Sequence, residues 1–260
     1  MCKLFFFFLF FLTAVFITVN DAQAQTIRVL AYNIHHGEDV NGKLNLQQIA
    51  DVINKANPDV VALEEVDSMT NRTNKVDQLK ELAALTNMQY FYGKNMDYDG
   101  GGYGVGILTK WPITRTFTTR LPNFPQSEPR VAATVEVQLK DNKSFLFTAI
   151  HLDYVRNPAE RIAQAKKLQE VFFAIDTPSI LAGDFNAQPD ETAMKDIIFS
   201  MYDETDFTGH SLSFPSDEPK IKIDYVLVSK NHHWEKQHYE VIDEKVASDH
   251  RPVLSVVQLK

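Results

Sequence analysis

Amide, carboxylate and imidazole side chains close short apolar runs along the chain, where they could hold a metal ion and cleave a phosphate ester. They are Asn33, Glu65, His151, Asp184 with Asn186, Asp224, and Asp249 with His250. Strands that end at one edge of a sheet would gather these groups at one site. Mg²⁺ prefers oxygen ligands and keeps several waters, and it can neutralise charge on a phosphoryl group. The residue types therefore indicate phosphoester hydrolysis with Mg²⁺, or with Mn²⁺ in its place.

The segment 179–186 combines an apolar strand with an acid and an amide. The run ends at Gly183, and Asp184 and Asn186 follow at alternate positions, which lie on one side of an extended chain. A carboxylate and an amide placed there can orient a water molecule and a phosphate oxygen. The alternative is an ordinary turn, in which the Asp and Asn side chains form hydrogen bonds with their own backbone.

Two histidines follow or precede apolar strands. Asp249 stands directly before His250, and by accepting a hydrogen bond from it would fix the imidazole tautomer and raise its basicity. His151 closes the strand 145–150, and Asp224 enters a late strand. A buried structural histidine and a solvated acid are the ordinary alternatives for the last two.

Other polar residues are open to more than one interpretation. Glu64 and Glu65 close the strand 59–63, and alternation predicts that one faces inward and the other away without choosing between them. Arg72 and Arg130 lie in polar segments and could clamp phosphate, or be solvated loop residues.

The remaining assignments are structural. We expect Arg161 to pair with a nearby acid and Tyr103 to be a half-buried strand residue, with a place in the lining of the cleft as the alternative for Tyr103. Four phenylalanines are assigned to the core: Phe145, Phe147, Phe172 and Phe173.

Two strand-helix-strand units position these residues. Apolar spacing predicts strand 27–34, helix 44–56 and strand 59–63, then strand 145–150, helix 158–174 and strand 179–182. Further strands are expected at 103–108, 131–139, 226–228 and 253–257. Each unit ends both strands with polar groups, as two halves meeting at one cleft would. We predict an α/β four-layer sandwich, in which two mixed sheets pack face to face with helices outside.

The N-terminus has the pattern of a secretory signal. Lys3 is followed by the apolar run 4–19 and by Ala22-Gln23-Ala24, a small-residue cleavage pattern. The expected organisation is a signal peptide at 1–24 and one domain at 25–260, exported to the periplasm or beyond. An uncleaved anchor is the alternative. After cleavage we expect a monomer with no membrane span.

Charge and cysteine content limit the function further. The formal net charge is −8, which disfavours nonspecific binding of nucleic acid, although a local basic patch could override it. Cys2, the single cysteine, lies in the leader. Disulfides, thiolate chemistry and a structural zinc are therefore not expected.

Six motifs in register resemble those of the endonuclease/exonuclease/phosphatase superfamily, which includes pancreatic deoxyribonuclease, abasic-site endonuclease, neutral sphingomyelinase and inositol polyphosphate 5-phosphatase. They are Ala31-Tyr32-Asn33, Leu63-Glu64-Glu65-Val66, His151-Leu152-Asp153, Gly183-Asp184-Phe185-Asn186, Ile223-Asp224-Tyr225 and Ser248-Asp249-His250. The resemblance runs from about position 27 to the C-terminus and implies a deoxyribonuclease I-like fold.

The resemblance also implies roles for these residues. Glu65 would be the metal carboxylate, with Asn33 beside it. Asp184 would activate water, Asn186 would contact phosphate, and His151 and His250 would bind or protonate phosphate oxygens. Asp249 would hold His250, and Asp224 would be the remaining acid of the site.

One position departs from the pattern of abasic-site endonucleases. His35 stands where they carry an Asp, which weakens a repair function and leaves a second metal position open. We expect an exported phosphoesterase that hydrolyses a small or lipid-derived phosphoester by direct attack of water. A secreted endonuclease and a noncatalytic binding module are the alternatives.

Overall fold

The computed structural model describes residues 25–139, 143–209 and 211–260. The predicted signal peptide at 1–24 lies outside them, so its cleavage stays a prediction. Within the described ranges, no helix combines the length and the apolar character that a bilayer crossing requires.

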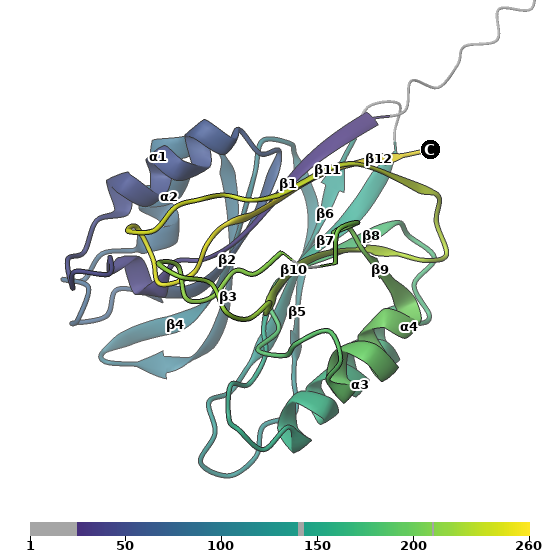
Figure 1. The fold of residues 1–260 in the computed structure, drawn as a ribbon. Helices are drawn as coiled ribbons and strands as arrows, with labels where there is room; N and C mark the ends of the chain where they lie inside the picture. The colour runs from purple at the N-terminus through teal and green to yellow at the C-terminus, as the bar shows by residue number, and fades with distance from the viewer. Residues whose placement is uncertain (1–24, 140–142, 210) are drawn as a thin grey trace, which may run out of the picture.

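In the part of the chain that the structure describes, twelve strands form two six-stranded sheets (Figure 1). The first sheet has the order β11-β12-β1-β2-β4-β3, with bounds Trp234–Val241, Val253–Leu259, Gln25–Asn33, Val60–Ser68, Gly101–Thr109 and Gln89–Tyr98. The second has the order β5-β6-β7-β8-β10-β9, with bounds Ile113–Arg120, Val131–Gln138, Ser144–His151, Ser179–Asp184, Asp224–Ser229 and Tyr202–Glu204.

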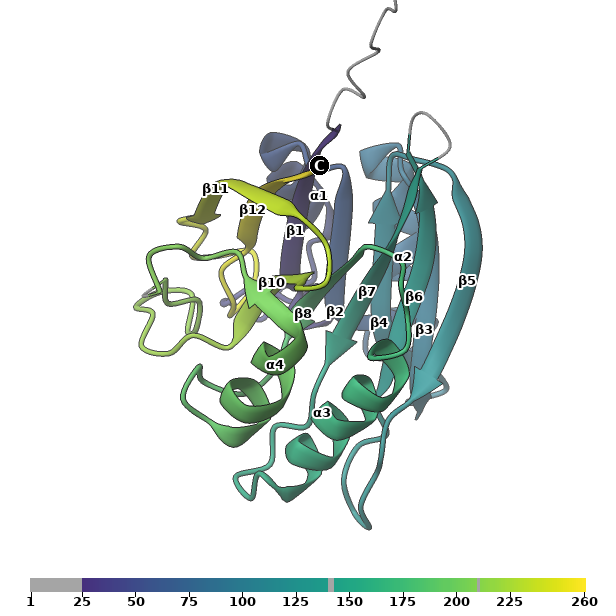
Figure 2. The same ribbon diagram turned by 90° about the vertical axis from the view of Figure 1, so that its right-hand side faces the viewer.

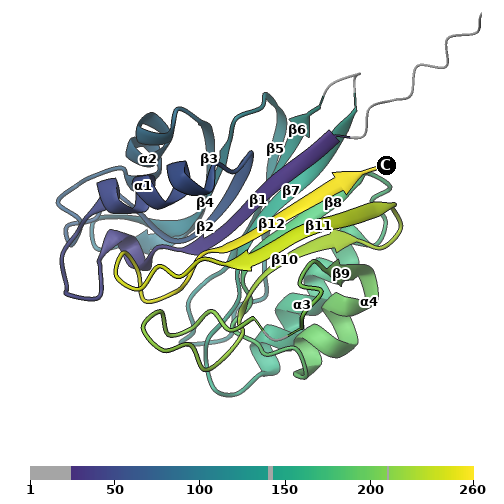
Figure 3. The same ribbon diagram turned by 45° about the horizontal axis from the view of Figure 1, so that its top comes forward.

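Helices cover the outer face of each sheet, which confirms the α/β four-layer sandwich. On the first sheet lie α1 (Leu46–Ala56) and α2 (Gln78–Thr86), and on the second α3 (Ala159–Phe172), the π-helical turn η3 (Ala193–Ile198) and the short α4 (Phe199–Met201). Figures 2 and 3 show the two groups of helices on opposite sides of the strands. The core between the sheets is built from β-branched, alanine and phenylalanine side chains.

The two predicted strand-helix-strand units are both present. Strands β1 and β2 are parallel and joined by α1, and β7 and β8 are parallel and joined by α3. Asn33 pairs with Glu64 at the end of the first unit, and His151 pairs with Asp184 at the end of the second. Because the two strands of each parallel pair end at paired residues, both units place polar side chains at the same end of the sandwich.

Sequence patterns missed one longer helix, three longer strands and short elements such as β9, η3 and α4, and misplaced one side chain. Helix α2 and strands β3, β5 and β11 were not predicted. Each of these strands is largely exposed along its length. The assignment of Phe173 to the core is wrong, because its side chain is 81% exposed just past the end of α3. Phe145, Phe147 and Phe172 are buried as expected, and Arg161 forms the expected ion pair, with Glu191.

We expect alanine to be strongly destabilising at Gly183, the residue of strand β8 directly before Asp184. The φ of Gly183 is +135°, and an added Cβ would lie 2.1 Å from the Ile150 carbonyl oxygen and 2.7 Å from Glu64 Oε1. Positive φ costs an L-residue about 1–2 kcal/mol, and overpacking adds about 1–3 kcal/mol. Urea unfolding should therefore show a loss above ~2 kcal/mol for Gly183→Ala.

Gly42→Ala is the matched control. Gly42 also has positive φ, at +77°, but its nearest contact to an added Cβ is 3.9 Å. It should show only the smaller conformational cost. Equal losses in the two variants would contradict the steric argument.

Candidate active site

A cleft of about 370 Å³ opens at the end of the sandwich where the parallel pairs finish. Eight of the ten predicted site residues line it together with two neighbouring histidines and several aromatic side chains. The predicted residues that line it are Glu65, Arg72, Arg130, His151, Asp184, Asn186, Asp249 and His250. The other two, Asn33 and Asp224, lie buried behind the lining.

Asp184 is the most heavily bonded acid of the cleft. Its Oδ1 accepts a hydrogen bond from the backbone N–H of Asn186 at 2.8 Å. Its Oδ2 accepts from Asn33 Nδ2 at 3.2 Å and lies 3.5 Å from His151 Nε2 and 3.8 Å from His250 Nε2. Burial raises the pKa of Asp184 to about 7, and the charge of Asp224 adds to the rise. A carboxylate with a pKa near neutrality is suited to accept a proton.

The partner of His250 is Asp224, and the expected pairing with Asp249 is wrong. His250 Nδ1 donates to Asp224, with 3.0 Å to Oδ2 and 3.2 Å to Oδ1, while Asp249 accepts a long hydrogen bond from Ser248 at 3.4 Å. Ser213 Oγ donates to Asp224 Oδ2 at 2.6 Å and fixes that carboxylate in turn. The neighbouring residue in the sequence, Asp249, was the wrong choice because the acid that pairs with His250 is Asp224, which lies in β10 of the second sheet.

The same contact sets the charge of His250. Burial alone would lower the pKa of this imidazole, but the Asp224 carboxylate, through its charge and its hydrogen bond, raises it to about 10. His250 is therefore an imidazolium at neutral pH, and its Nε2–H points toward Asp184.

His151 has the opposite character. Burial lowers its pKa well below the usual range, and the Arg130 guanidinium lowers it further. Arg130 Nη1 lies 3.0 Å from His151 Nδ1, and a guanidinium can only donate. His151 is thus neutral, with its single proton on Nε2, so it can donate a hydrogen bond to a phosphate oxygen while the buried Arg130 holds its tautomer.

A β-bulge places both acids of β2 at the site. The register of β2 against β4 shifts between Leu63 and Val66, where Glu65 has φ +59°. Glu65 lines the cleft, whereas Glu64 is fully buried and has no hydrogen-bond partner for either oxygen. Burial, followed by the charges of Asp224 and Asp184, raises the pKa of Glu64 well above its usual range. Simple alternation, which sends one of two neighbouring acids away, fails here because the bulge interrupts it.

Asn33 connects the two halves of the site. Its Nδ2 donates to Glu65 Oε1 and to Asp184 Oδ2, both at 3.2 Å, and its Oδ1 accepts from the backbone N–H of His35 at 3.1 Å. The amide thus bridges a carboxylate of the first sheet and one of the second. Its role as a metal ligand stays a prediction.

Asn186 and Arg72 reach the cleft by routes that the sequence did not show. Asn186 has φ +48°, so a turn brings it beside Asp184 in place of strand alternation, and its Nδ2 donates to the Leu152 carbonyl oxygen at 3.0 Å. Arg72 is held by Asp67 through two hydrogen bonds of 2.6 and 2.8 Å and lies over the ring of Tyr98. Tyr103 also lines the cleft, so it is more than a half-buried strand residue.

Comparisons with known proteins agree with this geometry. The sequence model of the Endonuclease/Exonuclease/phosphatase family matches residues 30–250. The chain belongs to the endonuclease/exonuclease/phosphatase family. Its members are hydrolases that act on phosphoester bonds. The chain is also 24% identical to the Escherichia coli (strain K12) protein YbhP over 223 residues, which covers 80% of this chain and 87% of YbhP.

Two solved structures share the fold. An endonuclease/exonuclease/phosphatase family protein from Bacteroides thetaiotaomicron has a TM-score of 0.76 at 18% identity, covering 92% of this chain and 99% of that one. A mannosyl-6-phosphatase from the same organism has a TM-score of 0.72 at 18% identity, covering 90% and 99%. At these identities the likeness shows the fold.

The endonuclease/exonuclease/phosphatase family generally depends on divalent metal, and the residues of this chain fit such an ion. Glu65 presents a carboxylate to the cleft, within 4.8 Å of donor nitrogens on His35 and His36. His36 Nδ1 is buried and has no hydrogen-bond partner, so a bound cation would satisfy it. The donor set therefore suits a cation bound beside Glu65.

The ion pair between His250 and Asp224 leads to a prediction for pH titration. Because the folded pKa of His250 is raised to about 10, its stabilising effect is complete below the unfolded pKa of about 6.5. The effect is lost as pH rises through 10. In ¹⁵N NMR spectra, His250 should keep imidazolium ring shifts beyond pH 9. In Asp224→Asn, the titration should move to or below the ordinary range, because burial then dominates.

Asp249→Asn is the control for this experiment. Since Asp249 is not bonded to His250, the variant should retain a strongly raised titration midpoint. If Asp249→Asn lowered the midpoint as far as Asp224→Asn does, the assignment of the partner would be wrong.

Proposed function

We propose that this protein is a divalent-metal-dependent phosphoesterase that hydrolyses a small phosphoester by direct attack of water. The observation that carries the proposal is the arrangement around Asp184. One of its carboxylate oxygens lies in the cleft among the Nε2 atoms of His151 and His250, across from Glu65. A base, two donors and a metal carboxylate thus converge on one space large enough for a phosphoryl group.

Each side chain has a distinct task in this reaction. Asp184, whose pKa is raised to about 7, accepts the proton of the attacking water. His151 donates from Nε2 to a phosphoryl oxygen without changing its own charge. His250, as an imidazolium backed by Asp224, places a positive charge beside the same group and stabilises charge that develops in the transition state. Asn186 borders the phosphate position from the Asp184 turn.

Glu65 is the side chain that would hold the divalent cation, with Asn33 fixing its Oε1 from behind. The cation supplies charge neutralisation for the phosphoryl and leaving oxygens. Mg²⁺ or Mn²⁺ meets this need, since either accepts a carboxylate and several oxygen ligands.

The lining of the cleft favours a small substrate over duplex nucleic acid. Both arginines of the cleft are already paired, Arg72 with Asp67 and Arg130 with Glu128, so little unpaired positive charge faces an extended polyanion. Aromatic side chains border the opening instead: Tyr98, Tyr103, Tyr154 and Phe214. Together with the net charge of −8, these features suit a compact phosphoester with a ring or short chain. The fold shared with a mannosyl-6-phosphatase makes sugar phosphates the first class to assay.

Export of the mature chain completes the proposal. The leader pattern at 1–24 supports secretion to the periplasm or beyond, and the mature protein would then act on phosphoesters outside the cytoplasm.

Two substitutions separate the roles of base and metal ligand. Asp184→Asn removes the proton acceptor while keeping shape, so turnover should fall by at least ~10²-fold with Mg²⁺ binding retained. Glu65→Gln should weaken both turnover and Mg²⁺ affinity. Steady-state hydrolysis and isothermal titration with Mg²⁺ measure the two quantities on the same samples. Near-normal rates in Asp184→Asn would refute its assignment as the base.

A substrate panel tests the preference for small phosphoesters. We expect hydrolysis of sugar phosphates or bis-p-nitrophenyl phosphate with Mg²⁺ or Mn²⁺, abolition by a chelator, and slower or no cleavage of plasmid DNA. Sphingomyelin vesicles report on lipid-derived substrates. Plasmid DNA cleaved faster than every small substrate would favour a secreted endonuclease, and no hydrolysis in any metal would favour a noncatalytic module.

A further inference from the structure

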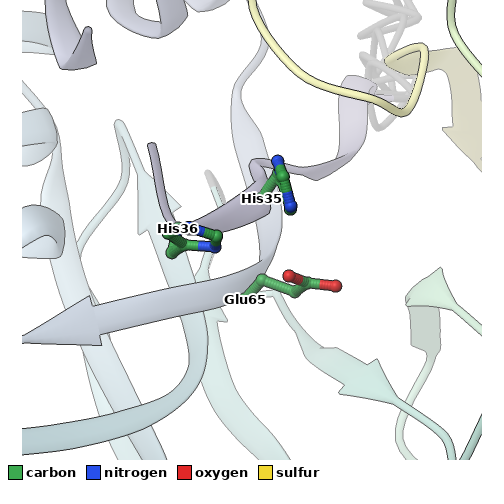
Figure 4. A group of neighbouring side chains, drawn as sticks. All are labelled: His35, His36 and Glu65. Atoms are coloured by element: carbon green, nitrogen blue, oxygen red, sulfur yellow. The ribbon is translucent and has the colours of Figure 1, made fainter. Parts of the chain in front are cut away.

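Two adjacent histidines and the bulged glutamate form a compact group at the wall of the cleft. His35 and His36 lie in the short turn η1 (His35–Gly37) and Glu65 lies in β2, and one donor atom from each falls within 4.8 Å of the others. Figure 4 shows the two imidazoles on one stretch of chain beside the Glu65 carboxylate. Because all three side chains are partly exposed, an ion from solution can reach them.

The backbone adopts unfavourable conformations to build this group. The φ angles are +44° at His35, +41° at His36 and +59° at Glu65, all in the left-handed region that residues with a Cβ avoid. Such residues concentrate at functional sites, where the surrounding structure holds them in place. Here the left-handed turn keeps successive imidazoles together, with ring centroids 4.5 Å apart. In a strand the two side chains would point to opposite faces.

The hydrogen bonds around the histidines leave nitrogen lone pairs for a ligand. His35 Nδ1 lies 3.3 Å from the Glu38 carbonyl oxygen, so Nδ1 carries the proton and Nε2 is the available acceptor. Metal-binding histidines commonly donate their second ring nitrogen to a carbonyl in this way. His36 Nδ1 is buried and has no partner. A bound cation would satisfy it.

The turn is also fixed from behind, as a metal site requires. Gln78 Nε2 donates to the His36 carbonyl oxygen at 2.6 Å, and Gln78 Oε1 accepts from the Asp67 N–H at 2.9 Å. An added Cβ at Gly37 would lie 2.8 Å from Gln78 and 2.9 Å from Leu46. The turn therefore packs tightly on α1 and α2, and its histidines are held without an ion.

A second candidate group, Asp184, Asp224 and His250, differs in a decisive respect. His250 Nδ1 is committed to Asp224, Asp224 accepts from Ser213, and all three of the group are buried. These charges satisfy one another, so the group needs no ion. In η1, by contrast, the buried His36 Nδ1 has no hydrogen-bond partner.

We propose that His35, His36 and Glu65 form a two-histidine, one-carboxylate site for a d-block divalent cation such as Zn²⁺, Co²⁺ or Mn²⁺. The proposal deepens the proposed function, on which it rests only in sharing Glu65, by naming the class of cation. Two imidazoles with one carboxylate are a donor set of catalytic zinc and non-haem iron sites. Mg²⁺, in contrast, takes oxygen ligands. The histidines thus make the Glu65 position bind such a cation more tightly than it binds Mg²⁺.

The test measures metal binding directly. Metal-free full-length mature protein is titrated with Co²⁺ while its visible ligand-field absorption is recorded, and affinity is confirmed by isothermal titration. We expect the protein to bind one Co²⁺ ion and to show the intense visible bands of a four- or five-coordinate site with nitrogen ligands. Millimolar Mg²⁺ should not displace this ion. His35→Gln and His36→Gln should each weaken Co²⁺ binding at least tenfold. His238→Gln, on the exposed strand β11, is the matched control and should bind Co²⁺ as the unaltered protein does.

Unchanged Co²⁺ affinity in both η1 variants overturns the proposal. A measurement that needs no substitution guards against misfolded variants. In ¹⁵N NMR spectra of the unaltered protein, Zn²⁺ should shift His35 Nε2 and His36 Nδ1, and ring shifts that stay constant at saturation likewise overturn the site.

Hydrolysis separates this proposal from the proposed function. If the η1 variants keep Co²⁺ affinity while Mg²⁺ supports turnover, the d-block site is wrong and the phosphoesterase stands. If Co²⁺ binding depends on both histidines but no phosphoester is cleaved with any metal, the site stands and the phosphoesterase is wrong.

Discussion

The ion pair between Asp224 and His250 is the interaction on which the rest of the site depends. Both groups are buried, and a buried charge is tolerated only when it is paired and hydrogen-bonded. The Nδ1 contact of 3.0 Å to Asp224 Oδ2, which also accepts a hydrogen bond from Ser213, meets that condition. The resulting imidazolium directs its second N–H toward Asp184, so a base with a raised pKa can be ionised beside it.

The site then divides its acids by environment. Glu64 is buried without a hydrogen-bond partner, and its raised pKa keeps it uncharged. Asp184 is equally buried but has several donors around it, and its pKa rises only to about 7. Glu65 reaches the cleft. Three carboxyl groups within one small region avoid mutual repulsion because one is neutral, one is stabilised by neighbouring donors and one faces the position of a cation.

The sequence predicted the layers and the two parallel units, because strands β1, β2, β7 and β8 are buried on both faces and read as continuous apolar runs. It missed all four outer strands of the two sheets: β3 and β11 of the first, and β5 and the three-residue β9 of the second. The three longer of these strands are largely exposed and carry many polar residues. Pairing with a buried neighbouring strand stabilises them, and the hydrophobic pattern of their own sequence does not reveal this tertiary contribution.

Site residues were predictable where a strand end fixes them and not where a partner comes from elsewhere in the fold. His151 and Asp184 are aligned by the register of β7 and β8. The acid that pairs with His250 could not be predicted from the adjacent sequence, because Asp224 lies in β10, 26 positions away. The tautomer of His151 depended on Arg130, 21 positions away.

Local strain explains why alternation failed at the most functional positions. Glu65 and Asn186 both have positive φ, and each stands where regular strand geometry would have sent the side chain elsewhere. The left-handed residue at Glu65 lets β2 contribute two acids at once, and that at Asn186 turns the chain so that its own N–H binds Asp184. A rule based on strand parity assumes unstrained backbone. In this cleft, the deviations from that geometry are what bring the functional groups together.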